Sequence, residues 1–104
     1  MDDGLRDRIK STLEGNKVVL FMKGSKHFPQ CGFSAHVVGI LKEHAVDFRD
    51  VNILTDPELR QGLKEYSNWP TYPQLYVDGK LVGGADIVSS LHENGELDGV
   101  LGRG

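Results

Sequence analysis

The only cysteine of the 104-residue chain, Cys31, lies in the stretch "PQCGFS" and is followed three positions later by Ser34. A dithiol redox site would carry its second sulfur at the position of Ser34. Pro29 and Gly32 indicate a loop that leads into a helix, and the free N–H groups at a helix start stabilise a thiolate. An isolated cysteine can also be an inert small hydrophobe, but these loop residues argue against a packed strand interior. We therefore expect a single reactive thiol.

Two other stretches are able to present backbone groups to a ligand. In "WPTYPQ", residues 69–74, a cis bond before Pro73 would free the N–H and C=O of Tyr72 for pairing with an extended peptide. In "VGGADI", residues 82–87, backbone amides at a helix start are suited to a carboxylate, and Asp86 is suited to capping the helix or accepting from an ammonium group. Taken alone, the first stretch is better explained as an ordinary Pro-rich turn, and the second is weak evidence because Gly-Gly before an N-cap Asp is common in plain turns.

Three cations are candidates for binding one anion. Lys23 follows the first expected strand, and Arg60 and Lys64 are four residues apart on one face of an expected helix. The alternative is that they are solvated surface charges, which the nearby Glu58 and Glu65 favour.

The histidines show no spacing typical of metal ligands and no recognisable relationship to the thiol as a base. We expect them to be surface or structural residues. They are His27, His36, His44 and His92.

The elements that must position these groups follow from hydrophobic periodicity and turn residues. Leu5, Ile9 and Leu13 recur at helical spacing, and Asp78–Gly79 is typical of a two-residue hairpin turn. The expected elements are a helix ending near Gly15, a strand over 17–22, a helix over 33–44, a strand over 46–53, a helix over 56–67 with Asp56 as its N-cap and Pro57 in its first turn, a hairpin over 74–83, and a helix over Asp86–Glu93 followed by a stop at Gly95.

This order predicts an α/β fold with a small four-stranded mixed sheet flanked by helices. The helix over 33–44 is a crossover between two parallel strands, and the hairpin adds two antiparallel strands. No repeat or linker interrupts the chain, so we expect residues 1–104 to form a single domain.

Composition excludes several classes of protein. The net charge of −3, from 12 basic and 15 acidic residues, lacks the basic excess of a nucleic-acid binder. No window approaches the roughly 18 apolar residues of a membrane span. A single cysteine cannot form an internal disulfide, so we expect an intracellular reducing compartment.

Taken together, these motifs resemble the monothiol glutaredoxins of the CGFS type in the thioredoxin superfamily. The resemblance spans residues 17–95. It rests on "KG" followed by "PQCGFS", on "LRQGLKEYSNWPTYPQLYV" (residues 59–77), and on "VGGADI" followed by "ENGEL". The combination is highly specific, whereas "CGFS" alone is not.

The resemblance implies a thioredoxin-like fold with Pro73 cis and a groove for the tripeptide glutathione. The site residues that it implies are Cys31 as catalytic residue and cluster ligand, Lys23 and Arg60 at the glycyl carboxylate of glutathione, Tyr72 along its cysteinyl backbone, and Ala85 with Asp86 at its γ-glutamyl end. Two carboxylates and one ammonium group on glutathione match two cations at one end and amides with an acid at the other.

Two positions differ from the commonest family pattern. Many members carry a cysteine where this chain has Ala85, so no second thiol is available for an internal disulfide. Tyr72 is bulkier than the valine or isoleucine often found there, but its backbone is the part expected to contribute.

The resemblance implies a carrier of 2Fe-2S clusters. Such a cluster is commonly held by four thiolates, and two protomers that each give Cys31 and one bound glutathione supply four. We expect a homodimer in the cluster-bound form and apo iron–sulfur proteins as recipients. The alternative is a glutathione-dependent thiol-disulfide oxidoreductase, and a third hypothesis is a module that binds a BolA-like protein. Similarity of "ENGEL" and "VVGIL" to plant plastid members favours the plastid stroma, with mitochondrion and cytosol as alternatives.

Overall fold

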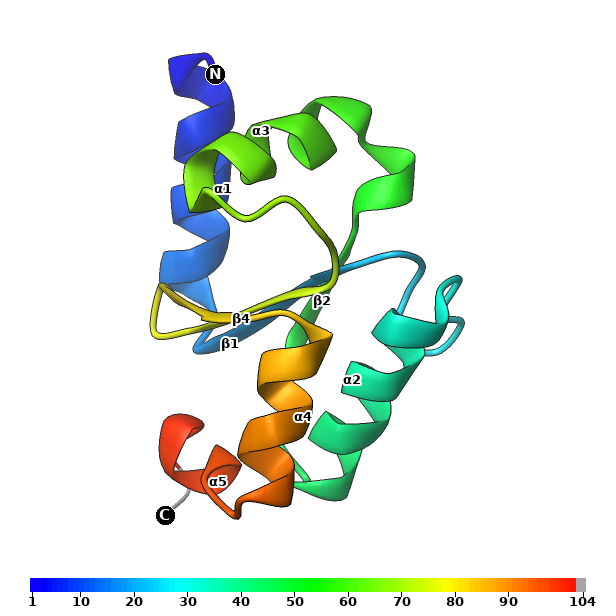
Figure 1. The fold of residues 1–104 in the computed structure, drawn as a ribbon. Helices are drawn as coiled ribbons and strands as arrows, with labels where there is room; N and C mark the ends of the chain where they lie inside the picture. The colour runs from blue at the N-terminus through cyan, green and yellow to red at the C-terminus, as the bar shows by residue number, and fades with distance from the viewer. Residues whose placement is uncertain (103–104) are drawn as a thin grey trace.

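The computed structural model describes residues 1–102, which form a four-stranded mixed sheet with helices on both faces (Figure 1). The strand order is β2-β1-β3-β4. Strand β1 (Val18–Met22) pairs in parallel with β2 (Arg49–Asn52) and antiparallel with β3 (Gln74–Val77), and β3 pairs antiparallel with β4 (Lys80–Gly83). The expected fold class and sheet are confirmed.

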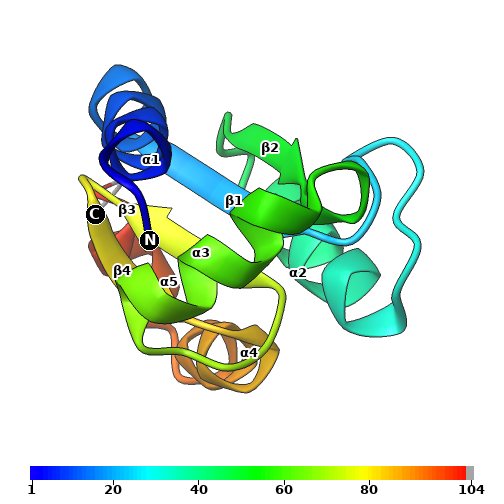
Figure 2. The ribbon, with the colours of Figure 1, turned by 90° about the horizontal axis from the view of Figure 1, so that it is seen from above.

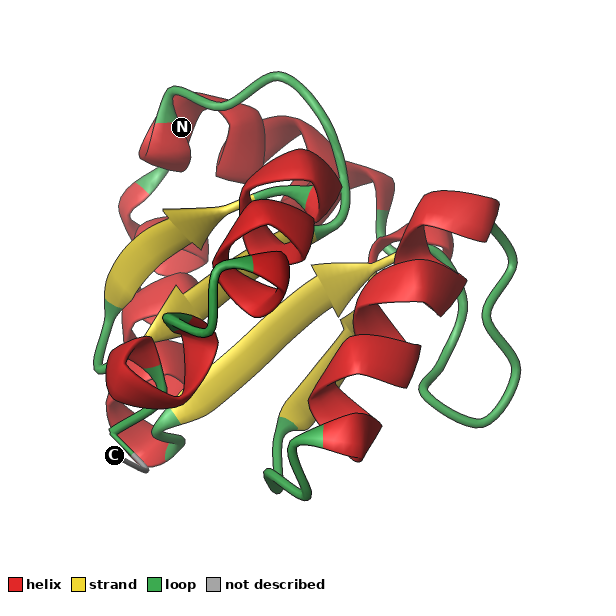
Figure 3. Cartoon of the chain, turned by 60° about the horizontal axis from the view of Figure 1, so that its bottom comes forward, coloured by secondary structure: helices red, strands yellow, loops and turns green. Residues whose placement is uncertain are grey.

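The helices form two layers, one on each side of the sheet. They are α1 (Asp3–Gly15), α2 (Gly32–Glu43), the 3-10 helix η1 (Ile53–Thr55), α3 (Pro57–Ser67), α4 (Ala85–Glu93) and α5 (Leu97–Val100). Helices α1 and α3 lie on one face, and α2, α4 and α5 lie on the other (Figures 1 and 3). None of the helices within residues 1–102 is long and apolar enough to cross a membrane.

Strand β1 is buried on both faces because it lies between these layers. Val18, Leu20 and Met22 pack into the core beneath α2 and α4, whereas Val19 and Phe21 pack into the core beneath α1 and α3. Alternation of side chains along a strand explains this division. The two cores fix the direction of β1 and therefore the place where the chain leaves it, just before the thiol loop.

The N-terminus of α3 is held as the sequence predicted. The Asp56 side chain caps the helix by accepting a hydrogen bond from the Leu59 N–H at 3.1 Å. Its other carboxylate oxygen accepts from Arg8 on α1 at 2.7 Å, and that bond is the main reason why the pKa of Asp56 is lowered. The contact ties together the two helices on this face, which lie close to each other when the molecule is viewed from above (Figure 2).

Some boundaries differ from the sequence predictions. The strand expected over 46–53 is limited to Arg49–Asn52, because Ala45 adopts a positive φ and Val46 still bonds back to Leu41 at the end of α2. Helix α5 was not predicted, although its first residue Leu97 and its C-cap residue Leu101 are buried at a spacing of one helical turn. Helix η1 was also missed.

The hairpin and the start of α4 depend on special backbone conformations. Asp78 and Gly79 both have positive φ, at 52° and 79°, as a type I′ turn requires. Gly83 has a φ of 148°, and a Cβ atom there would come within 2.8 Å of the Ile87 side chain. Glycine at this position therefore allows α4 to begin directly against the end of β4.

Candidate functional site

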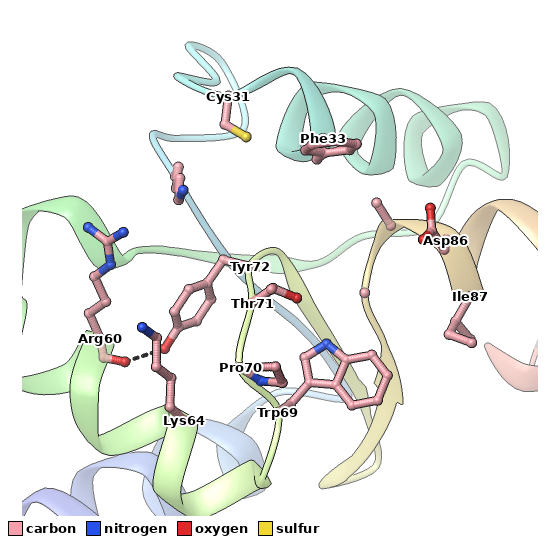
Figure 4. A pocket seen from close by; sticks show the side chains of 13 residues that line it. Cys31, Phe33, Arg60, Lys64, Trp69, Pro70, Thr71, Tyr72, Asp86 and Ile87 are labelled. Carbon is pink, nitrogen blue, oxygen red and sulfur yellow. Dashed lines mark hydrogen bonds between the residues drawn. The ribbon is translucent and has the colours of Figure 1, made fainter.

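A surface cavity of about 420 Å³ opens at the end of β1, where the loops before α2, before β3 and before α4 meet (Figure 4). The six site residues implied by the family resemblance line it, and so does the third candidate cation, Lys64. The six are Lys23, Cys31, Arg60, Tyr72, Ala85 and Asp86. The fold therefore brings together residues that are up to 63 positions apart, from Lys23 to Asp86.

Cys31 occupies the N-cap position of α2 and is partly buried at the rim of the cavity. Its pKa is lowered chiefly by the backbone N–H of Ser34, with smaller contributions from the Phe33 N–H and the charge of Lys23, while burial acts in the opposite direction. Cys31 is a free thiol and is only partly buried, so its sulfur is accessible at the cavity. The geometry favours an accessible thiolate, as expected.

Ser34 has a structural role that the sequence did not reveal. Its side chain is fully buried, and its hydroxyl accepts a hydrogen bond from the Lys23 N–H at 3.1 Å. This bond joins the end of β1 to the first turn of α2. The residue that stands in place of a second thiol thus fixes Cys31 relative to the sheet.

The loop between Lys23 and Cys31 is attached to β2 by side chains. The carboxamide oxygen of Asn52 accepts from the Gly24 N–H at 3.0 Å, and the carboxylate of Asp50 accepts from the Lys26 N–H at 2.8 Å. The ammonium group of Lys26 donates to the Phe48 carbonyl. These contacts hold the loop against the edge of the sheet at β2.

Tyr72 forms the floor of the cavity, and the Tyr72–Pro73 bond is cis as expected. Within residues 1–102, its backbone N–H and C=O make no hydrogen bond to another protein group. Its phenol donates to the Arg60 carbonyl at 2.6 Å, and burial raises its pKa. The tyrosine therefore keeps its backbone free while its side chain attaches the floor of the cavity to α3.

A buried polar network holds the loop over residues 69–72. The Gln74 side chain is fully buried and donates to the Trp69 and Thr71 carbonyls at 3.1 and 3.2 Å. It also accepts from the Tyr76 hydroxyl at 3.1 Å, and burial raises the pKa of Tyr76 to about 12. Sequence analysis missed Gln74, because a single glutamine at the start of a strand gives no signal of such a role.

Opposite charges lie at opposite ends of the cavity. Arg60 and Lys64 project from α3 on one side, and Asp86 lies at the start of α4 on the other (Figure 4). The loop of Thr71 and Tyr72 runs between them. The cavity therefore matches an elongated ligand with a carboxylate at one end and an ammonium group at the other.

The structure changes the expectation for the start of α4. Gly84, not Asp86, is the N-cap residue, and no side chain caps this helix. Asp86 lies in the first turn and is exposed, so its carboxylate is free to face a ligand. The earlier expectation that Asp86 caps the helix is wrong, whereas its place beside the cavity agrees with the alternative.

The sequence also did not indicate the apolar residues that line the cavity. Phe33, with 65% of its surface exposed, and Ile87, with 41%, border the cavity near Cys31 and Asp86. Trp69 lines it too, and its buried indole N–H has no hydrogen-bond partner among residues 1–102. The signal for Phe33 was its position two residues after the thiol, at the exposed start of a helix.

Exchanging Lys23 for methionine is expected to raise the pKa of Cys31, because a positive charge that favours the thiolate is removed. The rate of alkylation by iodoacetamide, followed against pH, gives this pKa as its midpoint. Lys10→Met, on the exposed side of α1, is a matched control that should leave the midpoint unchanged. Equal midpoints for all three proteins would contradict the role of Lys23.

No three His, Cys, Asp or Glu side chains within residues 1–102 converge on a point suited to a metal ion. Cys31 is the single thiol ligand that this chain offers.

Comparison with known proteins agrees with this geometry. Residues 18–82 match the family model described as Glutaredoxin. The chain is 56% identical over 93 residues to a probable monothiol glutaredoxin 2 of Rickettsia typhi, covering 89% of this chain and 84% of the relative. It is 52% identical over 101 residues to an uncharacterized monothiol glutaredoxin of Synechocystis, covering 97% of this chain and 94% of the relative.

The solved structures agree as well. The solution structure of reduced poplar apo GrxS14 superimposes with a TM-score of 0.85 at 52% identity, covering 95% of this chain and 91% of the poplar chain. The family match, these relatives and the lone thiol followed by Gly-Phe-Ser lead to one conclusion. The chain belongs to the glutaredoxin family, as a monothiol member of the CGFS type with a thioredoxin-like fold.

Proposed function

We propose that the cavity binds glutathione with its thiol beside Cys31. The observation that carries this proposal is the arrangement of charge, with Lys23 and Arg60 at one end of the cavity and Asp86 at the other. Cavities that bind small molecules are typically about 300 to 1,000 Å³, and this cavity of about 420 Å³ falls in that range.

The backbone of Tyr72 supports the same ligand. An extended peptide pairs with free N–H and C=O groups in the manner of a neighbouring strand. Those of Tyr72 have no protein partner among the described residues and lie between the two charged ends. Glutathione in an extended conformation pairs there through its cysteinyl unit, with Ala85 and Asp86 at its γ-glutamyl end.

We further propose that the bound glutathione and Cys31 together hold a 2Fe-2S cluster as cargo. The cluster is commonly held by four thiolates, and one chain provides a single accessible thiol of lowered pKa. Two protomers, each with one glutathione, complete the set. Glutathione is not covalently attached to the chain, so the cluster is readily released to apo iron–sulfur proteins.

Anaerobic reconstitution with iron, sulfide and glutathione tests this function. The expected product is a dimer with one cluster and two glutathione molecules, measured by visible absorbance, iron content and size-exclusion chromatography. Cys31→Ser, which keeps the size and the N-cap position of the residue, should give no cluster. A cluster that forms without glutathione, or that persists in Cys31→Ser, would contradict the proposal.

A second function, reduction of glutathione mixed disulfides, is favoured by the lowered pKa of Cys31. The Cys31 thiolate attacks the glutathione sulfur of the mixed disulfide, and the thiolate of the substrate protein leaves. A disulfide then joins Cys31 and glutathione. A second glutathione thiolate then attacks this disulfide, which releases oxidised glutathione and restores the Cys31 thiolate. An assay coupled to glutathione reductase separates the two functions, because only this one gives turnover without iron.

A further inference from the structure

Two histidines far apart in the sequence meet at the end of the molecule away from Cys31. The Nε2 atom of His44, the C-cap residue of α2, lies 2.8 Å from the Nδ1 atom of His92 in the last turn of α4. Each ring also contacts a carboxylate through its other nitrogen, His44 with Asp98 at 2.6 Å and His92 with Glu43 at 3.5 Å. Together these four residues line a hollow of about 440 Å³.

The carboxylates favour one tautomer for each ring. Asp98 accepts a proton held on Nδ1 of His44, and Glu43 attracts a proton held on Nε2 of His92. The two remaining nitrogens then face each other with their lone pairs. Two lone pairs at 2.8 Å repel each other unless a proton or another cation lies between them. Histidines that bind metals commonly donate their other N–H to a carboxylate in this way.

We propose that His44 and His92 form a binding site for a divalent transition-metal ion, with Cu²⁺ bound most tightly. The ion binds the two facing nitrogens, Nε2 of His44 and Nδ1 of His92, and water fills the remaining coordination positions. Asp98 and Glu43 orient the rings without touching the ion. The site thus uses two protein ligands, one from each histidine.

The distance between the nitrogens favours this class of ion. Two nitrogens each about 2.0 Å from an ion are about 2.8 Å apart at a right angle and about 3.3 Å apart at a tetrahedral angle. The observed 2.8 Å corresponds to adjacent positions of a square-planar or octahedral ion. The ion lies off the line between the nitrogens, so the His92 ring must turn while Asp98 holds the more buried His44 ring. His92, whose side chain is 30% exposed, has room to do so.

The surrounding charge also favours a cation. Both histidines lie at helix C-termini, where the backbone carbonyls give a partial negative charge. The hollow is lined by two acids and two histidines, with no lysine or arginine. Imidazole ligands suit Cu²⁺, Ni²⁺ and Zn²⁺, and affinities for divalent ions generally peak at Cu²⁺.

Copper titration of the full chain tests the proposal. Cys31→Ser is used as the background, because the thiol would itself reduce or bind Cu²⁺. Position 31 lies 13 residues before His44, at the other end of α2, about 20 Å away at 1.5 Å per residue. Isothermal titration calorimetry should show one Cu²⁺ per chain, and His44→Gln or His92→Gln should each weaken binding at least about tenfold. Asp98→Asn should weaken it about 10- to 100-fold.

The chain provides matched controls. His36→Gln and His27→Gln remove the other two histidines, of which His36 contacts Ser89 on α4 at 3.3 Å, and both should leave the affinity unchanged. Equal losses in control and test variants, or no saturable binding, would overturn the proposal. NMR spectroscopy of the Cys31→Ser protein, which keeps all four histidines, tests the site without relying on the folding of any histidine variant. Substoichiometric Cu²⁺ should broaden the NMR signals of the His44 and His92 rings first, and earlier broadening of His27 or His36 would also overturn it.

Discussion

Arg60→Glu is expected to weaken the binding of reduced glutathione by about 100-fold. Arg60 lines the cationic end of the cavity, and a hydrogen bond to a charged group contributes about 1.5–3 kcal/mol. Glutamate removes that bond and adds repulsion of the glycyl carboxylate. Since each 1.4 kcal/mol changes affinity tenfold, the combined loss is about two orders of magnitude. Isothermal titration calorimetry gives the affinities directly.

Arg49→Glu is the matched control for this prediction. Arg49 is exposed at the start of β2 and pairs with Val19, toward the opposite end of the parallel strands from the cavity. It changes the net charge equally but should leave glutathione affinity within about twofold, because salt screens distant exposed charges. Equal weakening by both variants would show that the overall charge, and not a local contact, controls binding.

A modified ligand makes the test of Arg60 sharper. Glutathione with its glycyl carboxylate converted to an amide lacks the group proposed to meet Arg60. Wild-type protein and Arg60→Glu should therefore bind this amide with similar affinity. A difference as large as that for glutathione would place Arg60 at another part of the ligand. Failure of wild-type protein to bind glutathione at all would instead contradict the proposed function.

Gln74→Leu is expected to destabilise the fold by about 2–4 kcal/mol, because an unsatisfied buried polar group costs about 1–3 kcal/mol. The substitution leaves the Tyr76 hydroxyl and the carbonyls of Trp69 and Thr71 without their partner. The midpoint of thermal unfolding should fall by more than about 8 °C, since 1 kcal/mol corresponds to roughly 4–8 °C in a domain of this size. Calorimetry or circular dichroism measures this shift.

Gln61→Leu provides the control for Gln74. Gln61 is exposed on α3, and its side chain makes no hydrogen bond among the described residues. Surface substitutions of this kind usually change stability by less than about 0.5 kcal/mol. A similar loss of stability in both variants would mean that leucine itself, and not the lost network, causes the effect.

The sequence determined the local elements well, because their signals are local. The helical spacing of Leu5, Ile9 and Leu13, the Asp78–Gly79 turn and the Asp56 cap each lie within one element, and the structure confirms all three. The resemblance of the motifs to a known family extended the prediction from local elements to the site. It named six residues that the fold places around one cavity, although glutathione binding itself stays a prediction.

Only the tertiary structure determined which side chains meet. Ser34 bonds to the chain 11 residues earlier, and His44 contacts residues 48 and 54 positions later. The histidines were expected to be separate surface or structural residues, because their spacing along the chain indicates no common site. Their meeting depends on how α2, α4 and α5 pack on one face of the sheet. Hydrophobic periodicity tells which face of a helix is buried, but the polar groups that meet at its ends depend on packing between distant elements.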